Sequence, residues 1–400
     1  MPNQPSQILF EDENLLVRAV SGDRTKAAVS FASLRERKQG FGEAYFTRTN
    51  TPAVYFISKA DNWYLTPSTM AGCAVARTYL DRLGFGAVFT YGTSMGAYGA
   101  AMCSTAIQAD SCLLLAPQWS ANPAAPPYEE RWKGEARSVD FSTENLAVQI
   151  SLSAQKWIIA DLRSPDAKHA IFFNRVPKSE IINMPFGGHF IPAFLQECGA
   201  LKAILDHAYS ATLSSEVARR LARPNRMKSS FYWETIGRSA FENEKRFGTN
   251  SLGRRSIPFM RHAHAIAPKN ERIGLSLAHF LIDAGRADEA LAIFKLVADL
   301  DLGNHRAWRG ISRCHTKLRN FSQAVAAARF AAALAPESED LKRVLARTLS
   351  EVRQYDAAIT VLVGENLTSS SKDSDALMKI IVQKRDAEIA RSSSMRGKPQ

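Results

Sequence analysis

The first half of the chain alternates short apolar runs with longer stretches in which apolar residues recur every three or four positions. The short runs, rich in β-branched residues, predict buried strands, and the longer periodic stretches predict helices between them. This alternation is typical of the α/β class, in which helices cover both faces of a mostly parallel sheet. The predicted strands are 15–20, 27–31, 53–58, 87–91, 112–116, 156–160 and 180–184, and the predicted helices are 68–83, 97–107 and 191–208.

One segment, residues 118–150, interrupts this alternation. It is rich in proline and charge, and its first half contains two neighbouring prolines, Pro126 and Pro127. A segment of this length without periodicity predicts a lid-like insertion over the sheet rather than a further layer of it. Its aromatic residues either line a substrate pocket or pack in the ordinary way; they are Trp119, Tyr128 and Trp132.

The C-terminal part of the chain is rich in alanine and leucine and contains a repeat. Three copies begin at Ala287, Phe321 and Tyr355, and the interval from the first to the second equals that from the second to the third. Each copy places an alanine at its fourth position, where a small side chain lets two helices approach closely. Over about residues 235–366 the pattern resembles tetratricopeptide repeats (TPR). The resemblance implies an all-α stack of helix pairs that binds a protein partner or a second copy of the chain.

Composition restricts the class of protein. The chain has 400 residues and a formal net charge of +12, and none of its apolar runs approaches the roughly 20 residues of a membrane helix. Its first residues lack the basic start and apolar core of a signal peptide, so we expect a cytoplasmic protein without a membrane span. The five cysteines are scattered, which predicts reduced thiols rather than disulfides or a zinc site.

Basic residues concentrate between Glu216 and Arg261, where eleven Lys or Arg residues stand against four Glu residues. Because few aromatic residues are interleaved, we interpret this stretch as the solvated face of a linker and expect no nucleic-acid partner. The predicted domains are an α/β domain at 1–212, a basic linker with a helix at 213–252, repeats with a capping helix at 253–391, and a disordered tail at 392–400.

A candidate nucleophile lies in the motif Gly-Thr-Ser-Met-Gly at residues 92–96, which fits the pattern G-x-S-x-G. The motif follows a predicted strand and opens a predicted helix. In a sharp turn of this kind the nucleophile has a strained backbone, and side chains at Gly92 or Gly96 would collide with neighbouring elements. Ser94 would then project its hydroxyl above the sheet, and the Met95 amide would be free to stabilise an oxyanion.

A serine hydroxyl needs a base and a group that orients the base. His189, in the run Gly-Gly-His after the last predicted strand, is the candidate base. Two carboxylates follow the preceding strand. Asp166 is favoured because its loop can reach the histidine, and Asp161 is the alternative because it ends the strand itself. His169 is the rival histidine, which we interpret as a structural or supporting residue.

Residues 10–210 resemble the α/β-hydrolase superfamily. The resemblance rests on the chain order Ser94, Asp166, His189 and on the run Tyr-Gly-Thr-Ser-Met-Gly-Ala-Tyr at 91–98. More narrowly, the run Leu-Ala-Pro-Gln at 115–118 and the pair Asp166 and His169 are similar to bacterial hydrolase-like proteins linked to surface polysaccharides. The chain lacks a His-Gly-Gly-Gly run after its early strand, so the second oxyanion amide would come from Ala32 or Ser33.

The resemblance implies a serine hydrolase that acts on an ester or acyl group through a Ser-His-Asp triad, with no metal and no cofactor. An esterase or carbohydrate deacylase linked to bacterial polysaccharide is the leading hypothesis, with the repeats recruiting a protein partner or a second copy. Two alternatives remain. An acyltransferase would use the same triad, and a TPR scaffold would carry an inactive hydrolase-like domain.

Overall fold

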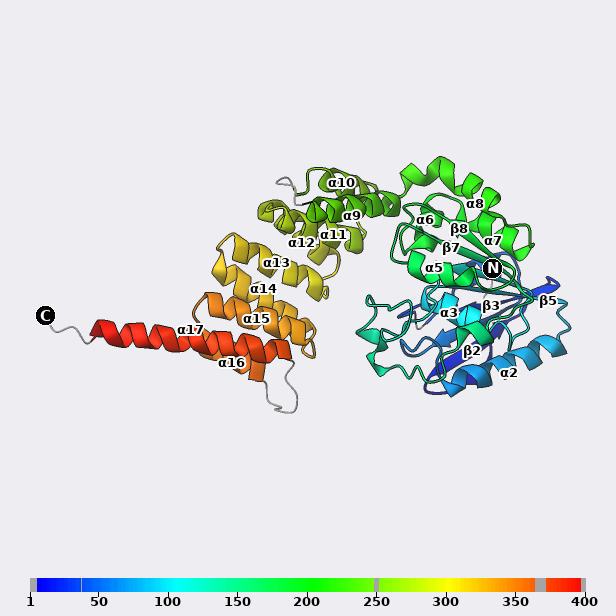
Figure 1. Ribbon diagram of the computed structural model, residues 1–400, viewed down its shortest axis with the longest axis horizontal. Coiled ribbons are helices and arrows are strands. Elements are labelled where there is room, and N and C mark those ends of the chain that lie inside the picture. Colours follow the sequence, from blue (N-terminus) through cyan, green and yellow to red (C-terminus); the bar gives the residue numbers. More distant parts are fainter. Residues whose placement is uncertain (1–5, 37, 248–251, 364–371, 397–400) are drawn as a thin grey trace. The chain divides into compact units, whose positions relative to one another are not determined.

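The computed structural model describes residues 6–36, 38–247, 252–363 and 372–396, and the chain divides into two compact units. The first unit is Met1–Thr235 and contains a sheet with helices, whereas the second unit, Ile236–Gln400, is helical (Figure 1). Within the described residues no helix is both long enough and apolar enough to cross a membrane.

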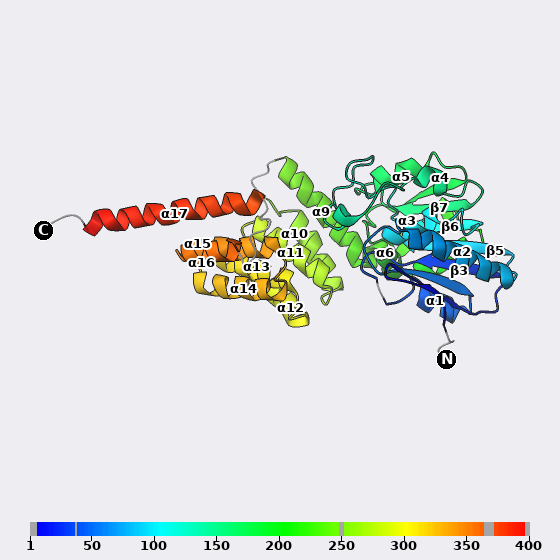
Figure 2. The same ribbon diagram turned by 90° about the horizontal axis from the view of Figure 1, so that it is seen from below.

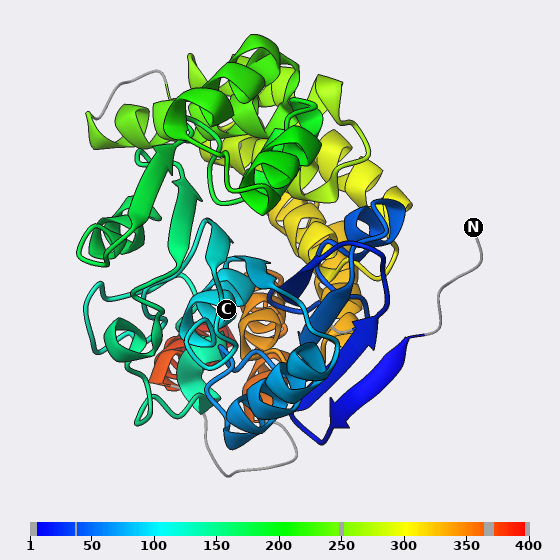
Figure 3. The same ribbon diagram turned by 90° about the vertical axis from the view of Figure 1, so that its right-hand side faces the viewer.

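The first unit is built on an eight-stranded sheet in the order β1-β2-β4-β3-β5-β6-β7-β8. The strands are β1 (Gln7–Glu11), β2 (Leu15–Val20), β3 (Lys26–Phe31), β4 (Ala53–Ser58), β5 (Ala87–Thr93), β6 (Ser111–Leu115), β7 (Gln155–Ala160) and β8 (Ser179–Asn183). Strand β2 pairs antiparallel with both β1 and β4, and every later pair is parallel. The sheet is therefore mostly parallel, as predicted, and β1 is an additional edge strand (Figure 3).

Helices cover both faces of this sheet. They are α1 (Glu43–Arg48), α2 (Pro67–Arg82), α3 (Met95–Met102), α5 (Ala167–Phe173), α6 (Ile191–Glu197) and α7 (Leu201–Tyr209). Helices α2, α3 and α5 share one apolar core with every second strand residue, such as Val29 and Ile158. On the opposite face, the Phe89 ring of β5 lies 5.9 Å from the Tyr209 ring of α7. The predicted helix 191–208 is two helices, because the chain turns at Gly199, whose φ of 69° favours glycine.

The insertion 118–150 contains only two short helical turns among its described residues, η1 (Glu135–Ser138) and α4 (Leu146–Gln149). Much of it is irregular, as its composition predicted. Part of it is nevertheless buried, because Glu129 and Gln118 are both 0% exposed. The segment is therefore anchored to the rest of the first unit through polar side chains as well as through apolar ones.

The predicted linker 213–252 is divided between the two units, because the first unit extends to Thr235. It contains α8 (Ser215–Ala222), η2 (Arg223–Lys228) and α9 (Ser230–Arg246). Two side chains of α8, Ala218 and Ala222, are at most 2% exposed. In addition, the hydroxyls of Ser229 and Ser230 each donate a 2.6 Å hydrogen bond to Glu197. These contacts hold residues 213–235 to the α/β unit despite their charge.

The second unit contains α10 (Ser256–Ile266), α11 (Glu271–Asp283), α12 (Ala287–Leu300), α13 (His305–Lys317), α14 (Phe321–Leu334), α15 (Glu339–Glu351), α16 (Tyr355–Val363) and α17 (Lys372–Arg396). Helices α11, α13 and α15 begin at one constant interval along the chain, and α12, α14 and α16 begin at the same interval, so the sequence repeat is a repeat of helix pairs (Figure 2). The alanines at the three predicted close contacts, Ala290, Ala324 and Ala358, are 0% exposed.

The long helix α17 continues to Arg396, beyond position 391, where we expected a capping helix to end and a disordered tail to begin. The predicted tail therefore overlaps this helix in residues 392–396, and its remaining residues, 397–400, lie outside the described part of the chain.

Candidate active site

Ser94 lies in a tight turn between β5 and α3. Its φ of 52° and ψ of −121° are strained for a residue with a side chain. A Cβ added at Gly92 would lie 2.2 Å from the carbonyl oxygen of Gly96, and one added at Gly96 would lie 2.2 Å from that of Phe31. Both neighbours are backbone atoms that cannot move aside. The two glycines therefore permit this turn for the steric reason that the sequence predicted.

Three predicted side chains meet at the end of the sheet where β5, β7 and β8 finish. The Oγ of Ser94 lies 3.0 Å from Nε2 of His189. On the other side of the ring, Nδ1 of His189 lies 3.0 and 2.9 Å from the two carboxylate oxygens of Asp166. An ionised carboxylate accepts hydrogen bonds and cannot donate them, so the hydrogen between His189 and Asp166 is on Nδ1 of His189. Nε2 therefore has no hydrogen and accepts a hydrogen bond from the Ser94 hydroxyl.

Asp166 is buried, and its side chain is 0% exposed, whereas that of His189 is 15% exposed. Burial alone would favour the neutral acid. The hydrogen bond and charge of His189, together with the Arg131 guanidinium, outweigh burial and hold the pKa of Asp166 below its ordinary value. The group beside His189 is therefore a carboxylate at neutral pH.

The alternative acid, Asp161, lies at the end of β7 and contacts backbone rather than the imidazole. Its carboxylate accepts hydrogen bonds from the amides of Gly188, at 3.0 Å, and Arg163, at 2.9 Å. Burial raises the pKa of Asp161, and these amide hydrogen bonds oppose the rise. Asp161 therefore holds the loop that carries His189, because it binds the amide of Gly188, the residue before His189.

The insertion supplies a partner for Asp166 that the sequence analysis did not identify. A guanidinium nitrogen of Arg131 lies 2.7 Å from Asp166, and another lies 2.7 Å from Glu129. The side chains of both carboxylates are 0% exposed, and that of Arg131 is 27% exposed. One arginine thus neutralises part of the charge of two buried acids, because it bridges them.

His169 extends the same network from α5. The Trp119 amide donates to Nδ1 of His169 at 3.0 Å, so Nε2 carries the hydrogen and donates to Glu129 at 2.7 Å. Burial lowers the pKa of His169 despite the adjacent carboxylate, so the ring is neutral. Burial opposes ionisation of Glu129, but its hydrogen bonds from His169 and Arg131 lower the pKa of this carboxyl. His169 thus supports Glu129 and does not contact Ser94.

The predicted oxyanion amides differ in their hydrogen bonding. Met95 begins α3, so its amide belongs to the first helical turn, which has no partner within the helix. The Ala32 amide donates to the Phe56 carbonyl at 2.9 Å. The Ser33 amide donates to the Glu36 carboxylate at 3.0 Å, and burial raises the pKa of that carboxyl although the hydrogen bond opposes the rise. Both candidates for the second amide are thus already engaged.

The aromatic residues of the insertion take different positions. The Trp132 ring lies 5.6 Å from the His189 ring, whereas Trp119 stacks on Phe172 of α5 at 5.5 Å. Tyr128 is 56% exposed. Of the three, Trp132 is therefore the one that borders the imidazole.

The five cysteines are buried and free. In the part of the chain that the structure describes, no group of three or more His, Cys, Asp or Glu side chains is arranged to hold a metal ion.

Comparison with known proteins identifies part of the second unit. Residues 254–314 match the tetratricopeptide repeat family. Among solved structures, the TPR domain of Arabidopsis OM64 is 17% identical, with a TM-score of 0.28, and the match covers 31% of this chain and 98% of that one. MamA from Desulfovibrio magneticus RS-1 is 11% identical, with a TM-score of 0.32 and coverage of 43% and 92%.

One further solved structure is the capsule O-acetyltransferase of Neisseria meningitidis serogroup A. It is 14% identical, with a TM-score of 0.37, and the match covers 52% of this chain and 95% of that one. No curated protein matches the chain. At these TM-scores the structural likenesses do not define a function, and the comparisons identify tetratricopeptide repeat sequence in residues 254–314.

Proposed function

We propose that the first unit is an α/β-hydrolase-like serine enzyme that cleaves an ester or transfers an acyl group. The observation that carries this proposal is the continuous chain of contacts from Ser94 through His189 to Asp166, at 3.0 and 2.9 Å. The strained turn at Ser94 supports the same proposal, because a functional site can retain backbone strain that folding alone disfavours.

The proposed chemistry begins with the imidazole as general base. As the Ser94 Oγ attacks the carbonyl carbon, Nε2 of His189 takes the hydroxyl proton, and the carbonyl oxygen becomes an oxyanion near the Met95 amide. The tetrahedral intermediate then expels the leaving alcohol, which receives the proton from His189 and leaves an acyl group on Ser94. Asp166 stabilises the imidazolium that forms in each step.

The acyl group leaves Ser94 when an acceptor attacks its carbonyl carbon. His189 removes the acceptor's proton and then gives it to the Ser94 oxygen as the bond between that oxygen and the acyl group breaks. If the acceptor is water, the protein is an esterase or deacylase, and a carbohydrate ester linked to bacterial polysaccharide is the substrate class that the sequence motifs favour. If the acceptor is a sugar hydroxyl, the same groups make an acyltransferase.

The TPR region supports a second role, the recruitment of a protein partner or of another copy of the chain. Its helix pairs recur at a constant interval along the chain, and the match to the repeat family covers 254–314. Helical repeats of this kind offer an extended surface for binding proteins.

The proposal is tested by labelling the full-length protein with a fluorophosphonate probe, which reacts with activated serines. We expect labelling of the wild type and none of Ser94→Ala or His189→Ala, with slowed labelling of Asp166→Asn. Ser210→Ala is a matched control, because Ser210 is exposed at the end of α7. An unlabelled wild type would favour a TPR scaffold with an inactive domain.

A further inference from the structure

A cavity lies in the first unit, away from Ser94, between the end of β8, α6, α8 and η2. Its volume is about 910 Å³, within the range of small-molecule sites. Four arginines line it, namely Arg219, Arg220, Arg223 and Arg226, and Glu216 is its only acidic lining residue among the residues that the structure describes. The first part of the basic stretch, interpreted from sequence as a solvated linker face, thus lines a cavity.

Nearby carboxylates do not neutralise the four arginines that line the cavity. Within the described part of the chain, none of the four forms an ion pair. The Arg219 Nε donates to the Ser215 carbonyl at 3.0 Å, and the Arg226 guanidinium lies 5.8 Å from the Tyr232 ring. Both contacts orient the side chains without neutralising their charge. Positive groups that converge without counter-charges favour an anionic ligand.

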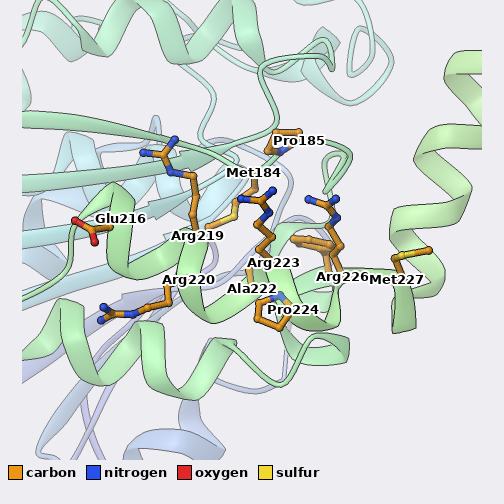
Figure 4. Close-up of a pocket in the computed structure, with 11 residues that line it drawn as sticks. Met184, Pro185, Glu216, Arg219, Arg220, Ala222, Arg223, Pro224, Arg226 and Met227 are labelled. Carbon is orange, nitrogen blue, oxygen red and sulfur yellow. The ribbon is translucent and has the colours of Figure 1, made fainter.

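Three of the guanidinium groups point the same way. Figure 4 shows Arg219, Arg223 and Arg226 extending toward the side where Pro185 lies, whereas the ends of Arg220 and Glu216 lie apart from them. A guanidinium binds phosphate through two parallel hydrogen bonds, so three of them suit a ligand with more than one phosphate group. A single carboxylate could not satisfy all three.

The base of the cavity is apolar. Met184 is 3% exposed and Phe194 is 2% exposed, while the Met227 side chain on the wall is 58% exposed. An inorganic anion would leave this surface uncovered, whereas a ligand with an organic portion would cover it. The flexible methionine side chains can adapt to such a portion.

The cavity also adjoins the loop that carries His189. A Cβ added at Gly187 would lie 3.2 Å from the Phe194 ring, so the base of the cavity packs against this loop. In addition, the Tyr232 ring beside Arg226 lies 5.8 Å from the Phe186 ring. A ligand in the cavity would therefore lie behind the histidine loop rather than on Ser94.

We propose that this cavity binds an organic phosphate of nucleotide size. Its phosphates lie among Arg219, Arg223 and Arg226, and its organic portion covers Met184, Phe194 and Met227. This inference goes beyond the proposed function, because it requires no reaction at Ser94.

Calorimetry on the full-length protein tests the proposal with four probes: coenzyme A, ADP, adenosine and inorganic pyrophosphate. We expect coenzyme A or ADP to bind at least tenfold more tightly than adenosine, which lacks phosphate, and than pyrophosphate, which lacks an organic portion. Their affinity should fall steeply as the salt concentration rises. Equal affinity for pyrophosphate, or no binding of coenzyme A and ADP, would overturn it.

Variants locate the site. Arg223→Gln should weaken binding at least tenfold, and Arg219→Gln with Arg223→Gln should abolish it. Lys228→Gln is the matched control, because Lys228 is exposed in η2 and does not line the cavity. The affinity of Lys228→Gln for coenzyme A and ADP should stay within twofold of the wild-type affinity. Ser94→Ala should bind as the wild type does, so failure of the acyl chemistry would leave this result unchanged.

Two outcomes would contradict the assignment. The first is undiminished binding by the double arginine variant, provided that it unfolds at the wild-type temperature. The second is tighter binding of a single-stranded oligonucleotide than of both small ligands, which would make the basic surface a nucleic-acid site.

Discussion

Replacing Arg131 by glutamine tests the network that supports the triad. The substitution removes the one positive group that bridges Asp166 and Glu129, each 2.7 Å from the guanidinium. In the wild type, two carboxylates and one arginine beside neutral His169 carry a net charge of −1. In the variant the two buried carboxylates repel each other, and no positive charge lies between them. The neutral glutamine can replace some of the hydrogen bonds of Arg131 but not its charge.

The magnitude follows from burial. Removal of one partner of a fully buried ion pair costs about 3–5 kcal/mol. The side chains of both acids are 0% exposed, but that of Arg131 is 27% exposed, so water partly replaces it. We therefore expect Arg131→Gln to lower the free energy of unfolding of the first unit by about 2–3 kcal/mol at pH 7.

A double variant isolates the electrostatic part. Adding Glu129→Gln to Arg131→Gln removes one of the uncompensated charges. The amide oxygen of the new glutamine is neutral and can still accept the hydrogen bond from Nε2 of His169. The double variant should therefore be about 1–2 kcal/mol more stable than the sum of the two single effects predicts.

The assay is urea unfolding followed by tryptophan fluorescence. Five of the six tryptophans report on the first unit; they are Trp63, Trp119, Trp132, Trp157 and Trp233. The lowered pKa values of Asp166 and Glu129 contribute stability above about pH 4, which is lost as the pH falls through the folded values. The gap between the wild type and Arg131→Gln should therefore narrow below about pH 4. If the effects of the two substitutions on the free energy of unfolding add within about 0.5 kcal/mol, Arg131 does not compensate the charge of Glu129.

Three further predictions concern the turn, the oxyanion site and His169. Gly96→Ala should abolish probe labelling and lower the unfolding temperature, because the new Cβ would lie 2.2 Å from the Phe31 carbonyl oxygen. Gly86→Ala is the control and should do neither, because no atom lies within 4 Å of a Cβ added there. Glu36→Ala frees the Ser33 amide and should speed labelling severalfold if Ser33 is the second oxyanion donor; an unchanged rate would exclude that role. The folded pKa of His169 is lowered, so wild-type stability should fall below about pH 6.5, by up to about 1.4 kcal/mol per pH unit. His169→Gln should reduce this slope, and an equal slope in urea titrations would contradict a buried neutral ring.

The sequence predicted the sheet well because its strands are buried on both faces and therefore appear as apolar runs. The seven predicted strands are all present, with ends that differ by at most two positions. Strand β1 was missed because it lies at the edge, where no residue is fully buried and the apolar pattern is weak. The approach of Ser94, Asp166 and His189 was predictable because each follows a strand, and parallel strands end at one edge of the sheet.

The supporting residues could not be found in this way. Glu129 and Arg131 lie in an irregular segment, where no periodicity shows which side chains turn inward. The one available signal was a run of charges in a segment expected to cover the sheet. Residues 213–235 were interpreted as a linker because the buried residues of α8 are small alanines that stand between arginines, so the segment shows no clear apolar pattern. The hydrogen bonds from this segment to Glu197 join positions that are far apart in the chain, and local patterns carry no information about such pairs.

In the proposed chemistry, one serine of this chain is activated by the imidazole on the loop after β8. Peptide mass spectrometry after reaction with a fluorophosphonate identifies the modified residue directly. We expect one adduct per chain, on the peptide that contains Ser94, and no adduct when His189 is replaced by alanine. An adduct on any other residue, or an unmodified protein under conditions that label a known serine esterase, would contradict it.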